Sequence, residues 1–316
     1  MVGGFKTLAD HAAIALTTCR AWYTLAWNAR GEEGRSEVEG ALAAVTVAGP
    51  ERCRLLTLAG LVRGYSGLRG GDERIAEAEV MAEEIGDAQL VADVDHHRTW
   101  YNHHFMLLRA GLETGRRAEA YHKTVGAHFE LADVRGSMDF MRTYRGEFVD
   151  MTRDAPEFLA QAGRIGHLAS SCGARLWPAW ISVLASGDLS EAAADLQHEV
   201  DLERRISYGL RGFSLLARAT TLEWGGEREA LLLYREAAAT EGQNMVTHTF
   251  ASALLLARVL FGEQDAAAEI MATAPLARAG TANLIGEWEQ LANIVEGRAV
   301  LGESAAVAPL YPLVVQ

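Results

Sequence analysis

The sequence predicts an all-α protein, a right-handed α-solenoid of about eight helix pairs. Three observations lead to this fold class. Helix formers such as Ala, Leu, Glu and Arg fill the stretches between only six prolines. Apolar residues recur at helical spacing, and no convincing strand alternation is present. A junction also recurs about every 38 residues between Gly34 and Gly302, which is the length of one helix pair. We therefore expect more than two thirds helix and no sheet.

Three apolar stripes support the helical periodicity, because their members fall on one side of a helix. The first stripe consists of Leu90, Val94, His97, Tyr101, Leu108 and Leu112, the second of Ile206, Leu210, Phe213, Ala217, Thr221 and Trp224, and the third of Met245, Phe250, Ala253, Ala257 and Leu260.

The junctions are glycines followed five residues later by alanine. They occur at Gly71/Ala76, Gly115/Ala120, Gly187/Ala192, Gly225/Ala230 and Gly262/Ala267, with weaker versions at Gly34, Asp154 and Gly302. A glycine that ends the first helix takes the left-handed conformation without strain, and a small alanine lets the second helix approach. Ser36, Asp154 and Asp188, each followed three residues later by Glu, resemble the capping boxes that begin helices.

The recurring Gly-x-x-x-x-Ala junction resembles that of tetratricopeptide repeats, although the spacing exceeds the usual 34 residues. The segments 107–120, 286–291 and 308–314 resemble the helical-repeat region that follows the ATPase module in bacterial signal-transduction ATPases and ATPase-linked class III nucleotide cyclases. The resemblance implies a single helical-repeat domain over residues 1–316, a regulatory arm that is a segment of a longer protein.

The catalysis of those proteins does not carry over. The chain has no Gly-x-x-x-x-Gly-Lys-[Ser/Thr] phosphate loop, and its only lysines are Lys6 and Lys123. We therefore expect a non-enzymatic chain without a cofactor.

Composition excludes several kinds of partner. Twenty-nine Lys and Arg stand against 42 Asp and Glu, a net charge of −13, which repels nucleic acid and anionic lipid. No apolar run approaches the length of a membrane span. Cys19, Cys53 and Cys172 follow no ligand or redox spacing, so we interpret them as reduced core residues. From composition we expect a soluble cytoplasmic chain, and the resemblance implies a bacterial one.

Four of the ten histidines cluster at His96, His97, His103 and His104 and raise the question of a metal site. Histidines seven apart on one helix are separated by about 10 Å, too far for one ion. Only Asp93 with His96 or His97 has suitable spacing, and further ligands would have to come from His122 or His128. The alternative is that His97 and His104 are partly buried core histidines, and we expect no metal.

Two other patterns give no catalytic site. Gly64-Tyr65-Ser66-Gly67 resembles the start of a nucleophile elbow, but Leu68 replaces the second glycine and no strand precedes it, so it indicates a helix end. Paired carboxylates such as Asp93 and Asp95 are interpreted as solvated helix faces. No catalytic residue is predicted.

Stacked helix pairs instead predict a surface, because the first helices of successive pairs line a concave groove. Counting back from the junctions places Tyr65, Asn102, Phe105, Arg109, Tyr144, Phe148 and Trp177 in that groove, together with Leu58, Leu61, Met141 and Ile181. Aromatic and Arg residues are typical of binding hot spots. In the alternative phase, the same residues belong to the core between repeats.

The predicted function is that of a protein-interaction and regulatory arm with a protein or peptide in the groove, and the parent's ATPase or cyclase module is one candidate partner. The alternative is a domain that senses a small-molecule effector, and a histidine-cluster metalloenzyme ranks third. An arm requires an open groove, whereas a sensor requires a closed pocket of roughly 300–1,000 Å³. The apolar residues after Gly302, ending at Val314-Val315-Gln316, have no polar capping helix, so we expect them to fray or to pack against another copy.

Overall fold

The structure is a computed structural model, and it describes residues 10–27, 31–65, 68, 70–167, 175–176, 178–179, 181, 187, 189–205, 212–240, 249–272 and 285–308. The chain divides into two compact units, Met1–Trp177 and Pro178–Gln316. Helices account for 84% of the structure and no described residue lies in a strand, which confirms the all-α helical-repeat prediction.

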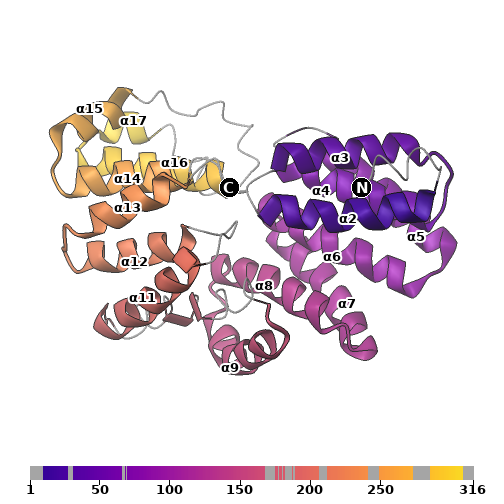
Figure 1. The fold of residues 1–316 in the computed structure, drawn as a ribbon. Coiled ribbons are helices and arrows are strands. Elements are labelled where there is room, and N and C mark those ends of the chain that lie inside the picture. Colours follow the sequence, from indigo (N-terminus) through magenta and orange to yellow (C-terminus); the bar gives the residue numbers. More distant parts are fainter. Residues whose placement is uncertain are drawn as a thin grey trace. The chain divides into compact units, whose positions relative to one another are not determined.

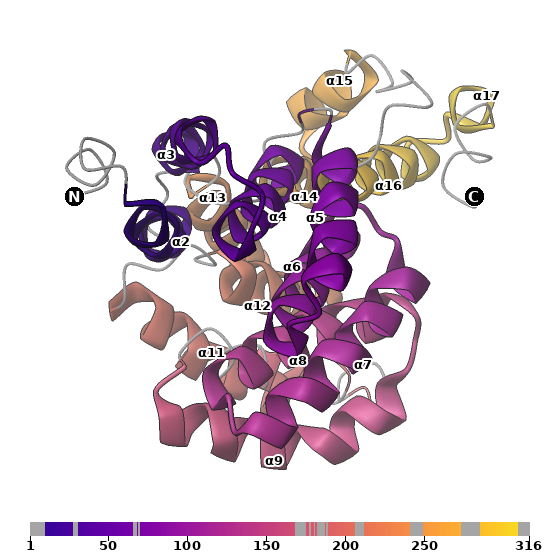
Figure 2. The same ribbon diagram turned by 90° about the vertical axis from the view of Figure 1, so that its right-hand side faces the viewer.

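Unit 1 is a series of helix pairs (Figure 1). Its helices are α2 (His11–Trp27), α3 (Gly31–Ala44), α4 (Pro50–Tyr65), α5 (Gly71–Ile85), α6 (Ala88–His104), α7 (Leu108–Val125), α8 (His128–Tyr144) and α9 (Phe148–Ile165). Figure 2 shows α2 and α3 side by side and nearly end-on. The end of α4 at Tyr65 confirms that the Gly64-Tyr65 segment is a helix end.

The first helices of successive pairs form one layer of unit 1. Helix α2 contacts α4, α4 contacts α6, and α6 contacts α8, while each second helix packs against the first helix of its own pair and of the next. Close approach between the layers depends on small residues. A Cβ added at Gly60 of α4 would lie 2.6 Å from the carbonyl oxygen of Gly71 in α5, so only glycine fits there. The apolar core therefore lies between the two layers.

Left-handed residues mark the turns with a regular period. Gly86, Gly126 and Gly166 follow α5, α7 and α9 at intervals of 40 residues. A second series has intervals of 36, 40, 41, 39, 36 and 40 residues and consists of Gly70, Met106, Gly146, Gly187, Gly226, Gly262 and Gly302. The predicted left-handed glycines at 187, 262 and 302 are confirmed, and those predicted at 71 and 225 are displaced by one residue.

Three predicted junctions are wrong, because Gly34, Gly115 and Asp154 lie inside α3, α7 and α9. Gly115 is small for another reason: a Cβ there would lie 2.7 Å from the Met138 side chain, so this glycine allows α7 to approach α8. Ser36 and Asp154 are likewise within helices and do not cap them, and Asp188 lies outside the described residues.

The apolar stripe predicted from Leu90 to Leu112 also crosses a turn. Helix α6 ends at His104 and α7 begins at Leu108, with Met106 at φ 56° between them. Leu90 and Leu112 are buried as predicted, but they belong to different helices. Helical periodicity continues by chance across this short turn, so the sequence does not reveal it.

Unit 2 contains α11 (Leu189–Arg205), α12 (Phe213–Trp224), α13 (Ala230–Ala238), α14 (Thr249–Leu260), α15 (Gln264–Ala272), α16 (Ile285–Val300) and α17 (Ser304–Val307). Its core surrounds Phe250, which is fully buried and meets the Phe213 ring edge-on at 5.3 Å between centroids. Residues 206–211, 245 and 309–316, which include parts of the predicted stripes and the apolar chain end, lie outside the described part.

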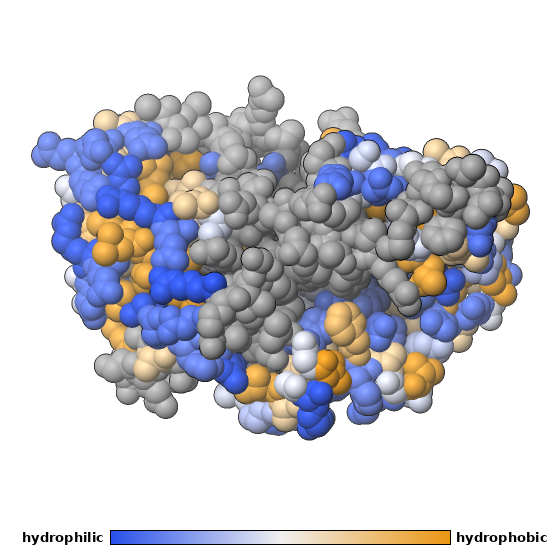
Figure 3. Space-filling view, in the orientation of Figure 1, coloured by the Kyte–Doolittle hydropathy of each residue, from blue (hydrophilic) through white to orange (hydrophobic). Residues whose placement is uncertain are grey.

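The described surface is mixed in polarity. Figure 3 shows hydrophilic residues interspersed with smaller hydrophobic patches on the face that it presents. None of the described helices is both long and apolar enough to cross a membrane.

Candidate ligand-binding site

A cavity of about 800 Å³ opens on the layer of first helices in unit 1. All four first helices of the unit, α2, α4, α6 and α8, contribute to its wall. The residues that line it are Ala12, Ala15, Leu16, Cys19, Glu51, Arg54, Thr57, Leu58, Gln89, Asp93, Val94, His96, His97, Phe129 and Glu130.

The repeat explains why these residues converge. The first helix occupies the same position in each pair. The beginnings of α4, α6 and α8 therefore lie at the same end of the layer. Asp87 fixes the start of α6, since its carboxylate accepts hydrogen bonds from the backbone N–H groups of Gln89 and Leu90. Glu51 and Glu130 lie in the first turns of α4 and α8, where the helix dipole stabilises a negative charge.

Asp93 is the central carboxylate of the cavity. Its Oδ2 lies 3.5 Å from Nε of Arg54. Burial raises the pKa of Asp93, Arg54 opposes that effect, and the like charge of Glu130 adds to it. Asp93 is therefore half-buried, and Arg54 compensates its negative charge only in part.

Two histidines of α6 form the wall beside Asp93. His97 Nδ1 donates to the backbone carbonyl of Asp93 at 2.7 Å, and burial lowers the pKa of His97 to about 4, so the ring is neutral at pH 7. His96 is buried, and its Nε2 donates to Oδ2 of Asp133 at 2.8 Å. Cys19, also in the wall, is a thiol because burial raises its pKa to about 11.

Behind this wall, Asp133 of α8 organises a buried polar centre. The same Oδ2 accepts from the Trp100 indole N–H at 3.0 Å, and His167 Nε2 lies 3.8 Å from Oδ1. The His167 ring also packs on Phe129, with 4.2 Å between ring centroids. A buried carboxylate is tolerated when it is hydrogen-bonded in this way.

The remaining histidines of the cluster are structural as well. His104 Nδ1 donates to the carbonyl of Trp100, and His103 Nδ1 lies 3.4 Å from the hydroxyl of Ser137. Burial lowers the pKa of His104 and His122 to about 4. Among the described residues, no group of three or more His, Cys, Asp or Glu side chains could hold a metal ion.

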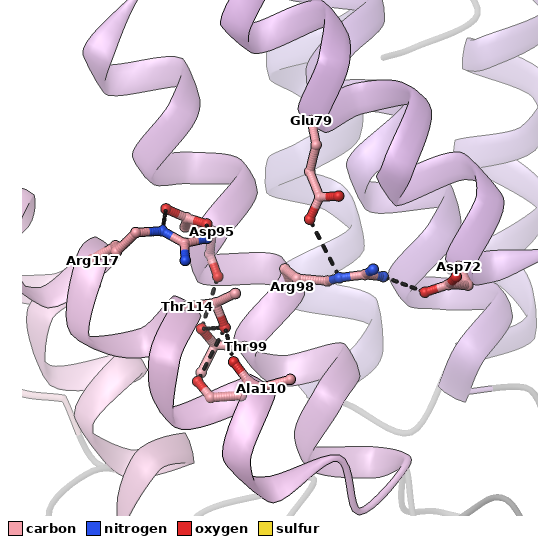
Figure 4. A network of polar contacts seen from close by, with 9 residues as sticks. Asp72, Glu79, Asp95, Arg98, Thr99, Ala110, Thr114 and Arg117 are labelled. Atoms are coloured by element: carbon pink, nitrogen blue, oxygen red, sulfur yellow. Dashed lines mark hydrogen bonds and ion pairs between the residues drawn. The ribbon is translucent and has the colours of Figure 1, made fainter.

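The opposite side of α6 carries a different polar network (Figure 4). Asp95 accepts two hydrogen bonds from Arg117 of α7, and the hydroxyl of Thr99 donates to the carbonyl of Asp95. Arg98 pairs with Asp72 and Glu79 of α5. Asp93 and Asp95, considered together in the sequence, thus face away from each other and cannot act as a catalytic pair.

Of the seven predicted groove residues, the five whose side chains the structure describes are not among those that line this cavity. Asn102 is buried, at 2% exposure, as the alternative phase expects, while Phe105 stacks on Tyr101 at 4.4 Å. Arg109, Tyr144 and Phe148 lie near the α6–α7 and α8–α9 turns. Trp177 and the side chain of Tyr65 lie outside the described part.

The positions expected in the two central pairs depend on their junctions. Five of those residues were counted back from Gly115 and Asp154, which are inside helices. Leu58 was counted from Gly71, which does begin the second helix of its pair, and Leu58 lines the cavity. Sequence reasoning missed Arg54, Glu130 and Phe129. The regular 40-residue spacing of Gly86, Gly126 and Gly166 would have located the beginnings of α6 and α8, and with them these positions.

Comparison with known proteins supports the fold. No family model matches the sequence, and no curated protein sequence matches it either. A solved structure does: the apo form of the quorum sensor NprR from B. thuringiensis superposes with a TM-score of 0.57 over 97% of this chain and 88% of that chain, at 15% sequence identity. The fold is a tetratricopeptide-like helical repeat. At this identity, the likeness concerns the fold alone.

Proposed function

We propose that this chain is the effector-sensing helical-repeat domain of a regulatory protein and acts without catalysis. The observation that carries the proposal is the cavity of about 800 Å³ formed by all four first helices of unit 1. Cavities of roughly 300–1,000 Å³ with mostly apolar walls and a few polar groups are typical of small-ligand sites. That geometry favours the sensor over the open groove of a pure interaction arm.

The chemistry of the wall supports binding more than catalysis. The ring of His97 is neutral and bonded to a backbone carbonyl, and that of His96 is bonded to buried Asp133. Cys19 is protonated because burial raises its pKa. A nucleophilic thiol needs a lowered pKa, and burial has the opposite effect on Cys19.

Contacts of the wall also connect the cavity with His167, near the end of unit 1. His96 is linked to His167 through Asp133, and Phe129 packs directly on His167. A ligand that moves His96 or Phe129 would change the packing of His167, which follows α9. An effector can bias two states of a protein only through such differential contacts. That NprR is a quorum sensor is in keeping with this role.

A second candidate, a protein-contact surface, is favoured by exposed apolar side chains near two neighbouring turns. Leu107, Tyr144 and Val149 are 49%, 39% and 82% exposed, and the predicted residues Arg109 and Phe148 lie among them. The partner proposed for this surface is a module of the parent regulator, such as an ATPase or a cyclase. If so, a Tyr144→Ser, Val149→Ser double variant should weaken binding to that module at least tenfold in calorimetry without changing ligand binding in the cavity.

The sensor proposal is tested by blocking the cavity. Leu16 lines it and is 54% exposed, so Leu16→Trp should fill space without straining the core. Fragment binding would be screened by two-dimensional NMR at millimolar concentration in the original protein, in Leu16→Trp and in the matched control Val80→Trp on α5, which is 56% exposed. Hits should disappear only in Leu16→Trp. Hits that persist equally in both variants, or no hits in any protein, would contradict the proposal.

A further inference from the structure

The charged groups of the cavity do not balance. Among the described lining residues there are three carboxylates, Glu51, Asp93 and Glu130, and one guanidinium, that of Arg54. Arg54 lies 3.5 Å from Asp93 and so is already engaged by one of the three. His97 adds no positive charge at pH 7, because burial lowers its pKa to about 4. The cavity is therefore negative on balance.

The two remaining carboxylates, Glu51 and Glu130, also line the cavity. Both occupy first turns of helices, where the dipole favours the charged form. Glu130 is near enough to Asp93 for its charge to raise the pKa of that residue. A cation between Asp93 and Glu130 would relieve the repulsion between these two carboxylates. The cavity is partly desolvated, and charge interactions there are stronger than in water.

Much of the rest of the wall is apolar, and it includes an exposed aromatic ring. Leu16, Leu58 and Val94 contribute aliphatic surface, and Phe129 is 48% exposed while belonging to the cavity. The face of an aromatic ring attracts cations and also packs against apolar groups. Apolar surface beside excess negative charge is complementary to a ligand that has an apolar part and a cationic part.

We propose that this cavity binds a small apolar molecule that carries one cationic group, an ammonium or a guanidinium, with the cation between Asp93 and Glu130 and the apolar body against Leu16, Leu58 and Phe129. The inference rests on the proposed sensor function and specifies the class of its effector.

The wall suits a small molecule better than a peptide. A bound peptide brings a series of backbone N–H and C=O groups, and each one buried without a partner costs about 1–3 kcal/mol. Of the described lining residues, Gln89 carries a side-chain amide that could both donate and accept for such a backbone, and the hydroxyl of Thr57 already donates to the Cys53 carbonyl. An anion is excluded by the charge balance.

The experiment uses three probes with one indole body and different charges: tryptamine, which is a cation, tryptophol, which is neutral, and indole-3-propionate, which is an anion. Dissociation constants are measured on the full chain by two-dimensional NMR at pH 7. Tryptamine should bind at least tenfold more tightly than tryptophol, and indole-3-propionate more weakly than both. The tripeptide Leu-Trp-Leu amide, which also carries one cation, should bind no more tightly than tryptamine.

Two variants locate the cation. Glu130→Gln and Asp93→Asn should each reduce the tryptamine preference to less than threefold while leaving tryptophol affinity within a factor of two. Glu84→Gln, on the exposed end of α5, is the matched control and should leave the preference unchanged. Circular dichroism verifies folding, and if Asp93→Asn fails to fold, Glu130→Gln alone decides the question.

The outcomes separate this inference from the function on which it rests. Equal affinity for the three probes, a preference for the anion, or a preference that survives Glu130→Gln overturns the cation proposal but leaves a ligand-binding cavity. Tenfold tighter binding of the tripeptide overturns the small-molecule class. If none of the probes binds at millimolar concentration and Leu16→Trp also changes no fragment hits, both proposals are wrong.

Discussion

The two sides of α6 hold similar charged residues in different situations. On the outer side, which bears Asp95, Arg98 and Thr99, each carboxylate meets arginine. On the inner side, which bears Asp93, His96 and His97, one arginine serves a cavity with three carboxylates. The outer side is a closed structural network, whereas the inner side has unmatched charge beside open volume.

Charge pairing distinguishes structural from functional polar groups on this repeat. A buried charge that is fully paired stabilises one arrangement, and removing its partner is costly. Charge that remains unmatched next to a cavity is maintained at some cost in stability and is a candidate for ligand recognition. Mutation should therefore affect stability on the outer side and binding on the inner side.

Acid should produce the largest effect, because it acts on a buried histidine of α6. His104 has a folded pKa of about 4 against 6.5 for the unfolded chain, because burial disfavours its charged form. A depressed pKa means that stability is full above pH 6.5 and falls as the pH decreases toward 4, by about 3 kcal/mol for a shift of this size. Urea unfolding at pH 7.5, 6.0 and 4.5 measures it, and His104→Gln should flatten part of the slope. A free energy of unfolding that does not change with pH would contradict the lowered pKa of His104.

Arg117→Ala tests the outer side. It would leave Asp95, which is 6% exposed, without its two charged hydrogen bonds, so we expect a loss of about 2 kcal/mol in the free energy of unfolding. Arg116→Ala on the same helix, at an exposed position, is the control and should change stability by less than about 0.5 kcal/mol. Equal effects of the two substitutions in denaturant unfolding would show that the outer network contributes nothing.

Thr99→Val is a milder test of the same side. The Thr99 hydroxyl is fully buried, donates to the Asp95 carbonyl and lies 3.0 Å from the hydroxyl of Thr114. Its removal should cost about 1 kcal/mol. Thr152→Val removes the same type of bond, to the carbonyl four residues earlier, at an exposed site and should be near neutral. The interpretation fails if chemical unfolding ranks the two variants in the reverse order.

Glu130→Gln should have the smallest effect on stability, within about 0.5 kcal/mol. Glu130 is half-buried in the cavity wall and does not belong to the apolar core. The substitution should nevertheless lower the pKa of Asp93, since the charge of Glu130 raises it. Carbon-13 NMR titration of the Asp93 carboxyl measures this shift. A raised or unchanged pKa would mean that the two carboxylates do not share the cavity.

Much of the fold follows from local patterns, and the errors have local causes too. Left-handed glycines at 187, 262 and 302 were predicted because only glycine adopts that conformation without strain. Met106 takes the same role without being glycine, so the α6–α7 turn was not found and Gly115 was selected in its place. Glycine thus has two uses here, turning the chain and admitting a neighbouring helix, and sequence alone does not distinguish them.

The all-α class and the repeat of nearly forty residues follow from the sequence, because backbone preference and helical period are local properties. Tertiary structure alone decided which residues share the cavity. Asp93, Arg54 and Glu130 come from three helices, and their proximity depends on the phase with which those helices stack. A displacement of one or two residues in a turn rotates a helix by 100° or 200°, roughly the angle that separates Asp93 from Asp95.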